Sequence, residues 1–261
     1  LKELEKEKGK FYATLITLSN HTPFEDVDKY GEYDVSMSVD GVRYDYMENT
    51  KLGNYFKSSH YADAQIGLLI EELKKENMLD NTVIIIYGDH DARIEKSEWN
   101  RFYNYDYKTS SIKSSDDESY VDIDYYFYEI NKKVPFIIWS NDEKFKTTLS
   151  KEIKEVGGMI DVGPTIMNLL GIHNKYFLGN DLLNKENNIV VFPNGNFVTD
   201  KVYYSELKNE YKLLKDVLIE ENYIENCKTY TEKIIDVSND IIVYNYFRKE
   251  LSEVRFEKEW E

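Results

Sequence analysis

One short apolar run, residues 82–87 (TVIIIY), constrains the fold of this chain more than any other feature. A continuous run of β-branched residues is typical of a strand that is covered on both faces, as in the sheets of α/β proteins. Two similar runs, residues 11–18 (FYATLITL) and 134–140 (VPFIIWS), predict further buried strands.

Helical patterns lie between and after these strands. Apolar residues recur at helical spacing over residues 58–75, where Ser58 or Ser59 can cap the start. Residues 161–170 predict a second helix, with Asp161 as its cap and Gly171 just after its end. Strands that alternate with helices indicate an α/β sheet.

Three segments depart from this pattern. The charged residues 1–10 are typical of a linker or helix end, and residues 22–57 predict a long loop. Residues 100–130 are rich in Tyr, then Ser, then acidic side chains, and predict an excursion from the domain surface. We expect one domain over residues 1–205 and a helical C-terminal appendage over 206–261, which is rich in Lys and Glu and carries apolar residues at helical spacing.

The charge balance limits the classes of partner. The chain has 49 Asp and Glu against 33 Lys and Arg, a formal net charge of −16, which argues against nucleic-acid binding through a broad basic face. One cysteine excludes an internal disulfide and a zinc site built from several cysteines. The sequence carries no membrane-spanning apolar run or signal-peptide pattern, and because it begins with Leu1 we expect a processed or excised piece.

The residues with the clearest chemical meaning are Gly88-Asp89-His90-Asp91, directly after the 82–87 strand. A carboxylate beside an imidazole suits Mn²⁺, Zn²⁺ or Mg²⁺, and the ends of strands are where α/β sheets collect ligands. Gly88 would allow the sharp turn. The alternative is a helix-capping Asp with a solvated His. His21 favours the metal site, because it too follows a predicted strand.

Other candidates have structural alternatives. We expect structural or solvated roles for His60 and His173, and a core position for Trp139. Arg93 could bind phosphate through two parallel hydrogen bonds or form a surface salt bridge. Cys227 lies in the predicted helical tail, in no context that suits a nucleophile.

Six blocks in order carry a family resemblance: ITLSNHTPF, SSHYADAQIGLLIEEL, NTVIIIYGDHD, KKVPFIIWS, GGMIDVGPTIMNLLGI and VVFPNGNFVTD. Over about residues 10–205 the chain resembles the extracellular catalytic domain of lipoteichoic acid synthases and related phosphoglycerol transferases. These enzymes belong to the sulfatase and alkaline phosphatase superfamily.

The resemblance implies a doubly wound α/β sheet with helices on both faces, incomplete at its N-terminal side. It implies Mn²⁺ or a similar ion held by Asp89 and His90, with His21 contacting the substrate phosphate. The implied reaction moves glycerol phosphate from a phosphatidylglycerol-type lipid head group to a cell-envelope polymer through a covalent Thr intermediate. The implied place is the extracellular face of a bacterial membrane, with transmembrane helices outside this chain.

The family's nucleophile belongs to the earlier part of the domain, so the resemblance implies no catalytic nucleophile in this chain and a missing N-terminal part as its partner. Two features differ from the family: Asp91 stands where an aromatic residue is common, and residues 110–130 do not align. Two alternatives stay open: a sulfatase or phosphodiesterase of the same superfamily, and a non-catalytic binding module. We expect the chain alone to be inactive and to bind metal weakly.

Overall fold

The structure, a computed structural model, describes residues 9–30, 32–149 and 151–248. Its contacts divide the chain into two compact units, residues 1–150 and 151–261, each of which is described by itself. Most of the predicted linker and the end of the predicted appendage, residues 249–261, lie outside the described residues. The predicted boundary at residue 205 stays a prediction.

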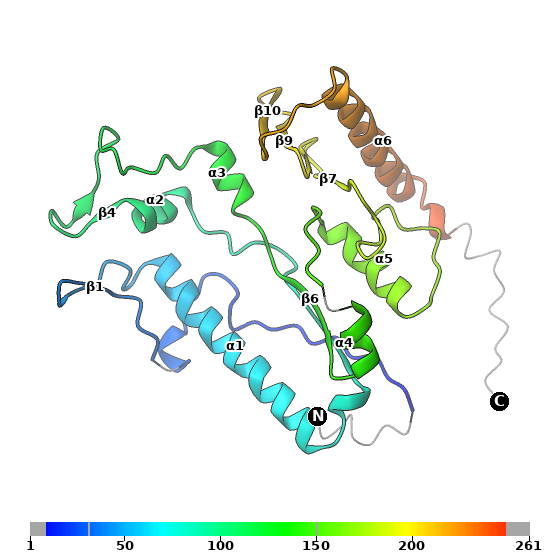
Figure 1. Cartoon of the computed structure of the whole chain (residues 1–261), viewed down its shortest axis with the longest axis horizontal. Coiled ribbons are helices and arrows are strands. Elements are labelled where there is room, and N and C mark those ends of the chain that lie inside the picture. The colour runs from blue at the N-terminus through cyan, green and yellow to red at the C-terminus, as the bar shows by residue number, and fades with distance from the viewer. Residues whose placement is uncertain (1–8, 31, 150, 249–261) are drawn as a thin grey trace. The chain divides into compact units, whose positions relative to one another are not determined.

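The first unit alternates helices with very short strands (Figure 1). Its elements in order are η2 Val27–Lys29, β1 Met37–Val39, β2 Val42–Tyr44, α1 Lys51–Lys75, η3 Leu79–Asn81, β3 Val83–Tyr87, α2 Lys96–Asn104, β4 Tyr105–Asp106, β5 Ser111–Ile112, α3 Tyr125–Ile130, β6 Phe136–Ser140 and α4 Glu143–Leu149.

The strands predicted at 82–87 and 134–140 are both present, as β3 and β6, and pair with each other. They run antiparallel, with Val83 opposite Ser140 and Tyr87 opposite Phe136. The prediction that β3 is covered on both faces is wrong for the described residues, because Val83 is 44% and Tyr87 42% exposed. The ribbon of β3 and β6 therefore keeps part of its apolar surface open.

The strand predicted at residues 11–18 is absent. The segment has no regular secondary structure, and Leu15 and Ile16 are 68% and 80% exposed. An extended segment becomes a strand only when its backbone groups pair with a neighbour, and none of the described strands pairs with this one. The sequence reveals an apolar segment, but the segment is not a strand because no described strand pairs with it.

Helix α1 begins earlier than predicted. Thr50 caps it by accepting a hydrogen bond from the backbone N–H of Gly53, at 3.0 Å. Ser58, predicted as a cap, is buried within the helix and donates its hydroxyl to the Tyr55 carbonyl, at 2.9 Å. Gly53 and Asn54, which are more typical of loops than of a helix start, concealed the true start.

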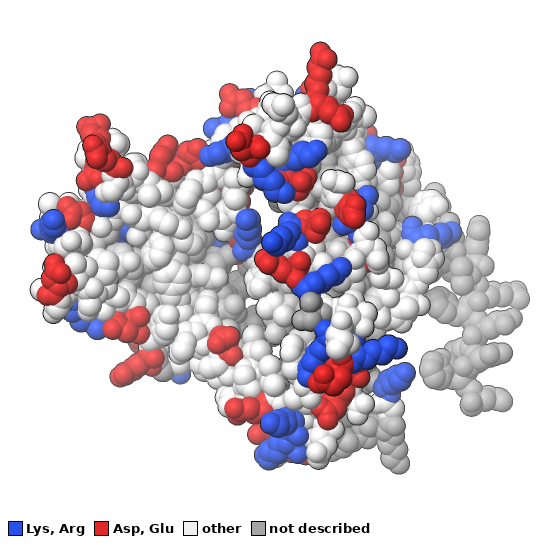
Figure 2. Space-filling model, viewed as in Figure 1, with Lys and Arg blue, Asp and Glu red and all other residues white. Residues whose placement is uncertain are grey.

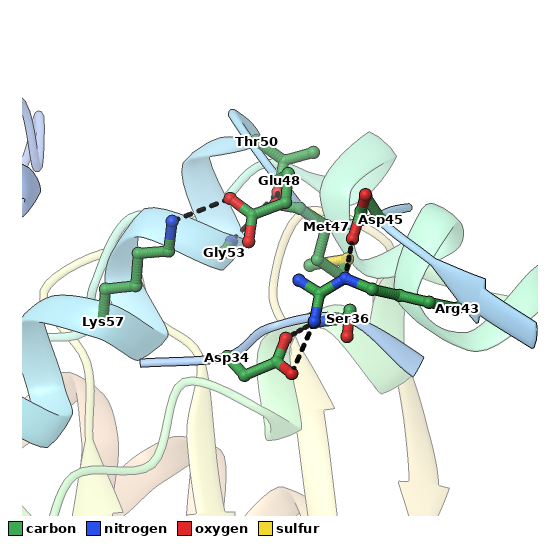
Figure 3. A network of polar contacts seen from close by, with 9 residues as sticks. All are labelled: Asp34, Ser36, Arg43, Asp45, Met47, Glu48, Thr50, Gly53 and Lys57. Atoms are coloured by element: carbon green, nitrogen blue, oxygen red, sulfur yellow. Dashed lines mark hydrogen bonds and ion pairs between the residues drawn. The ribbon is translucent and has the colours of Figure 1, made fainter. Parts of the chain in front are cut away.

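A polar network ties the loop before α1 to the helix (Figure 3). The Arg43 guanidinium bridges Asp34 at 2.8 Å and Asp45 at 2.7 Å, while Lys57 of α1 pairs with Glu48 at 2.7 Å. Hydrogen bonds from Ser36, with the nearby Arg43, hold the pKa of the Asp34 carboxyl below its usual range. Residues 34–57 are thus held by ion pairs as well as by packing.

Only the middle of the predicted excursion at 100–130 lies at the surface: residues 114–119 are exposed, whereas Asn104 and Ile123 are buried. Asn104, itself fully buried, holds its base together: its side chain accepts from the Val121 N–H at 2.7 Å and donates to the Val121 carbonyl at 2.8 Å. The acidic segment between these two residues can therefore project without loosening the elements on either side.

The second unit contains α5 Met159–Leu169, β7 Ile189–Val191, β8 Phe197–Thr199, β9 Val202–Ser205, β10 Glu210–Leu213 and α6 Tyr223–Val243. Its four strands form one antiparallel sheet in the order β10-β9-β8-β7. Phe197, Val202 and Tyr204 are buried against Ile224 and Cys227 of α6. The region predicted as a helical appendage thus includes a strand, and its helix packs on the sheet that precedes it.

Helix α5 begins two residues earlier than predicted, with Gly158 as its N-cap, and Asp161, which is 1% exposed, caps the helix from within its first turn. Its carboxylate accepts from the N–H groups of Gly158 at 2.9 Å and Asn180 at 2.7 Å, and from the Asn188 side chain at 2.8 Å. Gly171 follows the helix with a positive φ of 71°, as predicted for a residue that ends a helix.

Acidic and basic side chains are interspersed on the face of the molecule that Figure 2 shows, rather than gathered into one broad basic area. No helix among the described residues is long and apolar enough to cross a membrane.

Candidate metal and phosphate site

The candidate site begins where β3 ends, at Gly88. The Gly88 N–H donates to the Pro135 carbonyl at 3.1 Å, which holds the loop against the start of β6. A Cβ at Gly88 would lie only 2.7 Å from the Cβ of Val134. Gly88 does not have a positive φ, so a close approach of two chain segments, and not the predicted sharp turn, requires glycine here.

Asp89 and His90 follow with their functional atoms close together. The Asp89 Oδ1 lies 3.8 Å from the His90 Nε2, and Asp89 is 77% exposed. The His90 Nδ1 lies 2.7 Å from the Asp91 carbonyl. Because a carbonyl oxygen can only accept, Nδ1 carries the proton, which leaves a lone pair on Nε2, the atom nearer Asp89.

His21 lies beside His90, although 68 residues separate them in the sequence. The two rings meet edge to face with centroids 5.5 Å apart. The His21 Nδ1 lies 2.6 Å from the Thr22 carbonyl, so His21 also presents its Nε2 to ligands. The structure therefore brings together the three residues that the sequence singled out, His21, Asp89 and His90.

The residues fit part of a divalent metal site. Ligand atoms bonded at about 2.1 Å to one ion stand roughly 3.0–3.4 Å apart, so the 3.8 Å between Asp89 and His90 needs only a small adjustment. Within the described part of the chain, no group of three or more His, Cys, Asp or Glu side chains is placed to hold a metal. Asp89 and His90 therefore need further donors to complete a coordination shell.

Arg93 stands next to this site in a constrained backbone. Its φ is 51°, its N–H donates to the Asp91 carboxylate at 2.9 Å, and its carbonyl accepts from the Lys51 ammonium at 2.9 Å. Its guanidinium forms no ion pair or hydrogen bond with the described residues, so the surface salt bridge considered above is not found there. Arg43, by contrast, is held by two carboxylates.

Sequence reasoning missed Lys51, which also pairs with Glu95 at 2.7 Å. No local signal could reveal it, because Lys51 and the Arg93 carbonyl are 42 residues apart. The role of Asp91 in fixing the loop was detectable, since Asp often accepts from the N–H two residues later.

The remaining candidates have mostly structural environments. His60 stacks on Tyr33 with ring centroids 4.5 Å apart, and His173 is exposed, as predicted for each. Trp139 is half-buried and does not belong to the core clusters. Burial raises the pKa of the Cys227 thiol, which agrees with its predicted lack of nucleophilic character.

Comparisons with known proteins agree on one family. A family model described as Sulfatase matches residues 1–172. Lipoteichoic acid synthase 2 of Bacillus subtilis is 30% identical over 80% of this chain and 28% of its own length. Lipoteichoic acid synthase of Staphylococcus aureus is 30% identical over 93% of this chain and 34% of its own length.

A solved structure matches as well. The lipoteichoic acid synthase LtaP from Listeria monocytogenes aligns with a TM-score of 0.60 and 29% identity, over 89% of this chain and 54% of that one. The likeness confirms the predicted α/β, sulfatase-like fold. The chain spans about a third of the length of the curated relatives named above. It belongs to the sulfatase family, and the relatives it resembles there are lipoteichoic acid synthases.

Proposed function

We propose that this chain is part of a metal-dependent phosphoglycerol transferase of the lipoteichoic acid synthase type. The observation that carries the proposal is the meeting of His21 with Asp89 and His90, with rings 5.5 Å apart and ligand atoms 3.8 Å apart. Relatives named lipoteichoic acid synthase support the substrate class. The donor would be a phosphatidylglycerol-type head group and the acceptor a glycerol phosphate polymer outside the cell.

Asp89 and His90 would hold a divalent ion, for which we propose Mn²⁺, with Mg²⁺ or Zn²⁺ as alternatives. Such an ion neutralises charge that develops on phosphate oxygens and makes the phosphorus more electrophilic. The fixed Nδ1–H of His90 keeps its Nε2 available as a ligand, because the ring cannot turn without losing the hydrogen bond to the Asp91 carbonyl.

His21 would act on the phosphate rather than on the metal. With Nδ1 bonded to the Thr22 carbonyl, only Nε2 faces a ligand, and in the protonated ring this atom donates to a phosphate oxygen. The same proton can pass to the oxygen of the leaving diacylglycerol. The unpaired guanidinium of Arg93 would add a further charged donor at the rim of the site.

We propose that the nucleophile, a threonine, lies outside the 261 residues. Its Oγ–phosphorus bond would form as the bond from phosphorus to the diacylglycerol oxygen breaks. A hydroxyl of the acceptor polymer would then displace the threonine. The chain alone would accordingly catalyse no transfer, and the protein that carries it would act at the extracellular face of the bacterial cell membrane.

The test uses the intact protein, with a labelled phosphatidylglycerol head group and a metal assay. We expect Asp89→Ala and His90→Ala each to lose bound Mn²⁺ and at least about 100-fold in transfer. His21→Ala should keep the metal and lose transfer, because it removes a proton donor and not a ligand. The control is His173→Ala, an exposed histidine, which should retain both.

Two outcomes would change the proposal. Full transfer by Asp89→Ala after metal depletion and repletion would remove the metal-site assignment. Label found only as free glycerol phosphate, and none in polymer, would favour a hydrolase, the second function that membership of the sulfatase family supports.

A further inference from the structure

The second unit contains a hollow of about 440 Å³ between α6 and the ends of β7 and β8. We call it the α6 hollow. The residues that line it include Asn187, Lys201, Tyr223, Asn226, Cys227 and Tyr230. Its volume lies within the range of small-molecule sites, and it shares no residue with the candidate metal site.

The α6 hollow is locally cationic in an acidic protein. The Lys201 ammonium lies 5.0 Å from the centre of the Tyr223 ring and forms no ion pair with the described residues. No acidic side chain is among the residues that line the hollow. Two acidic neighbours of the lining are paired with lysines, Asp200 with Lys215 at 3.3 Å and Glu225 with Lys228 at 3.4 Å. A third, Glu186 beside Asn187, is exposed and forms no ion pair with the described residues. Lys201 therefore keeps its charge available to an anion.

The rest of the lining suits hydroxyl groups. The side chains of Asn187, Asn226 and Tyr230 form no hydrogen bond within the described part of the chain, and each can both donate and accept. Tyr223 is fixed, because its hydroxyl donates to Thr199 Oγ1 at 3.0 Å, so its ring offers an ordered apolar wall. A cation, two amides and an aromatic face together fit a compact ligand that carries both a negative charge and hydroxyls.

We propose that the α6 hollow binds a small phosphorylated polyol, with the phosphate on Lys201 and the hydroxyls on Asn187 and Asn226. If the proposed function holds, on which this part of the inference rests, the natural occupant is a glycerol phosphate unit of the acceptor polymer. The hollow would then hold the polymer away from the reacting phosphorus and favour long acceptors over single units.

The chain carries its own probe for this site. Cys227 is the only cysteine and lines the hollow, so its alkylation by iodoacetamide reports occupancy. Burial raises the pKa of Cys227, so the reaction needs mildly alkaline buffer, and the folded chain should react more slowly than the unfolded one. We expect glycerol 1-phosphate at millimolar concentration to slow alkylation of the 261-residue chain about threefold or more, and glycerol to have no effect.

Matched variants assign the effect to the cation. Lys201→Met should abolish the protection, whereas Lys215→Met, which removes a lysine already paired with Asp200, should keep it. Asn226→Asp should also weaken protection, because it places a negative charge beside the phosphate. Circular dichroism checks that each variant is folded.

Equal alkylation with and without glycerol 1-phosphate in the wild-type chain would overturn the proposal, as would undiminished protection in folded Lys201→Met. If glycerol 1-phosphate protects Cys227 but the intact protein shows no transfer, the α6 hollow remains a binding site and the proposed function is rejected. If the intact protein shows transfer but Cys227 is not protected, only the proposed binding site in the α6 hollow is rejected.

Discussion

Asp161 and Asp89 show how differently the two units use one side chain. Asp161 is 1% exposed and accepts three hydrogen bonds, one from the start of its own helix and two that join α5 to Asn180 and Asn188. Asp89 is 77% exposed, and the nearest charged partner of its carboxylate is His90, 3.8 Å away. The buried carboxylate serves the fold, whereas the exposed one keeps its oxygens available to a ligand.

The apolar residues of the two units differ in the same way. Val202 is 0% exposed beneath α6, but Ile16 is 80% exposed and β3 is only partly covered. The second unit buries its apolar side chains with its own elements. The first unit leaves a strand-like segment and a two-stranded ribbon open to further packing, on the same elements that carry His21 and Asp89.

The largest expected effect on stability comes from Asp161→Ala. Three donors would lose their acceptor in a buried place, which should lower the free energy of unfolding by about 3 kcal/mol or more. Asp89→Ala should change it by less than about 0.5 kcal/mol, because an exposed carboxylate contributes little. Urea unfolding followed by circular dichroism measures both. Asp236→Ala, on the exposed side of α6, is the control, and equal losses for Asp161 and Asp89 would contradict the comparison.

A smaller difference is expected from truncating apolar side chains. Val202→Ala leaves a cavity in a closed core and should cost about 2 kcal/mol in unfolding free energy. Ile16→Ala removes a side chain that is already in water and should cost less than about 0.5 kcal/mol. A large cost for Ile16→Ala in the same urea experiment would show that residues 11–18 are packed in solution.

The smallest of the three expected destabilisations is that of Gly88→Ala, at about 1 kcal/mol, because the added methyl collides with Val134. The double variant Gly88→Ala with Val134→Gly should recover part of the loss, since it removes the colliding atoms. Gly67→Ala is the control: that glycine lies in α1 with open space around it, and alanine should be neutral or stabilising. NMR of the His90 ring would show whether the loop moves. An unchanged His90 signal with full stability would refute the close-approach argument.

Local sequence patterns predicted the helices and strands that are determined by nearby residues. β3, β6 and α5 follow from apolar runs and caps, although α5 begins at Met159 and not at the predicted Asp161. The strand predicted at residues 11–18 is absent, because strand pairing depends on neighbouring strands and not on the segment itself. The start of α1 was missed because Thr50 caps a first turn that is poor in aliphatic side chains.

The candidate site was predictable in its residues but not in its supports. Gly88-Asp89-His90 is a recognisable sequence, and His21 could be added because it follows a second apolar run. The hydrogen bond from Lys51 to the Arg93 carbonyl and the close approach of Val134 to Gly88 are contacts between distant segments. No spacing in the sequence encodes them.

Each site histidine is anchored by the carbonyl of the residue that follows it, Thr22 for His21 and Asp91 for His90. The carbonyl of the next residue therefore fixes both the tautomer and the orientation of each ring. The acidic segment within residues 100–130 takes part in neither hydrogen bond. A change confined to a distant loop should therefore leave the tautomer of both imidazoles unaltered.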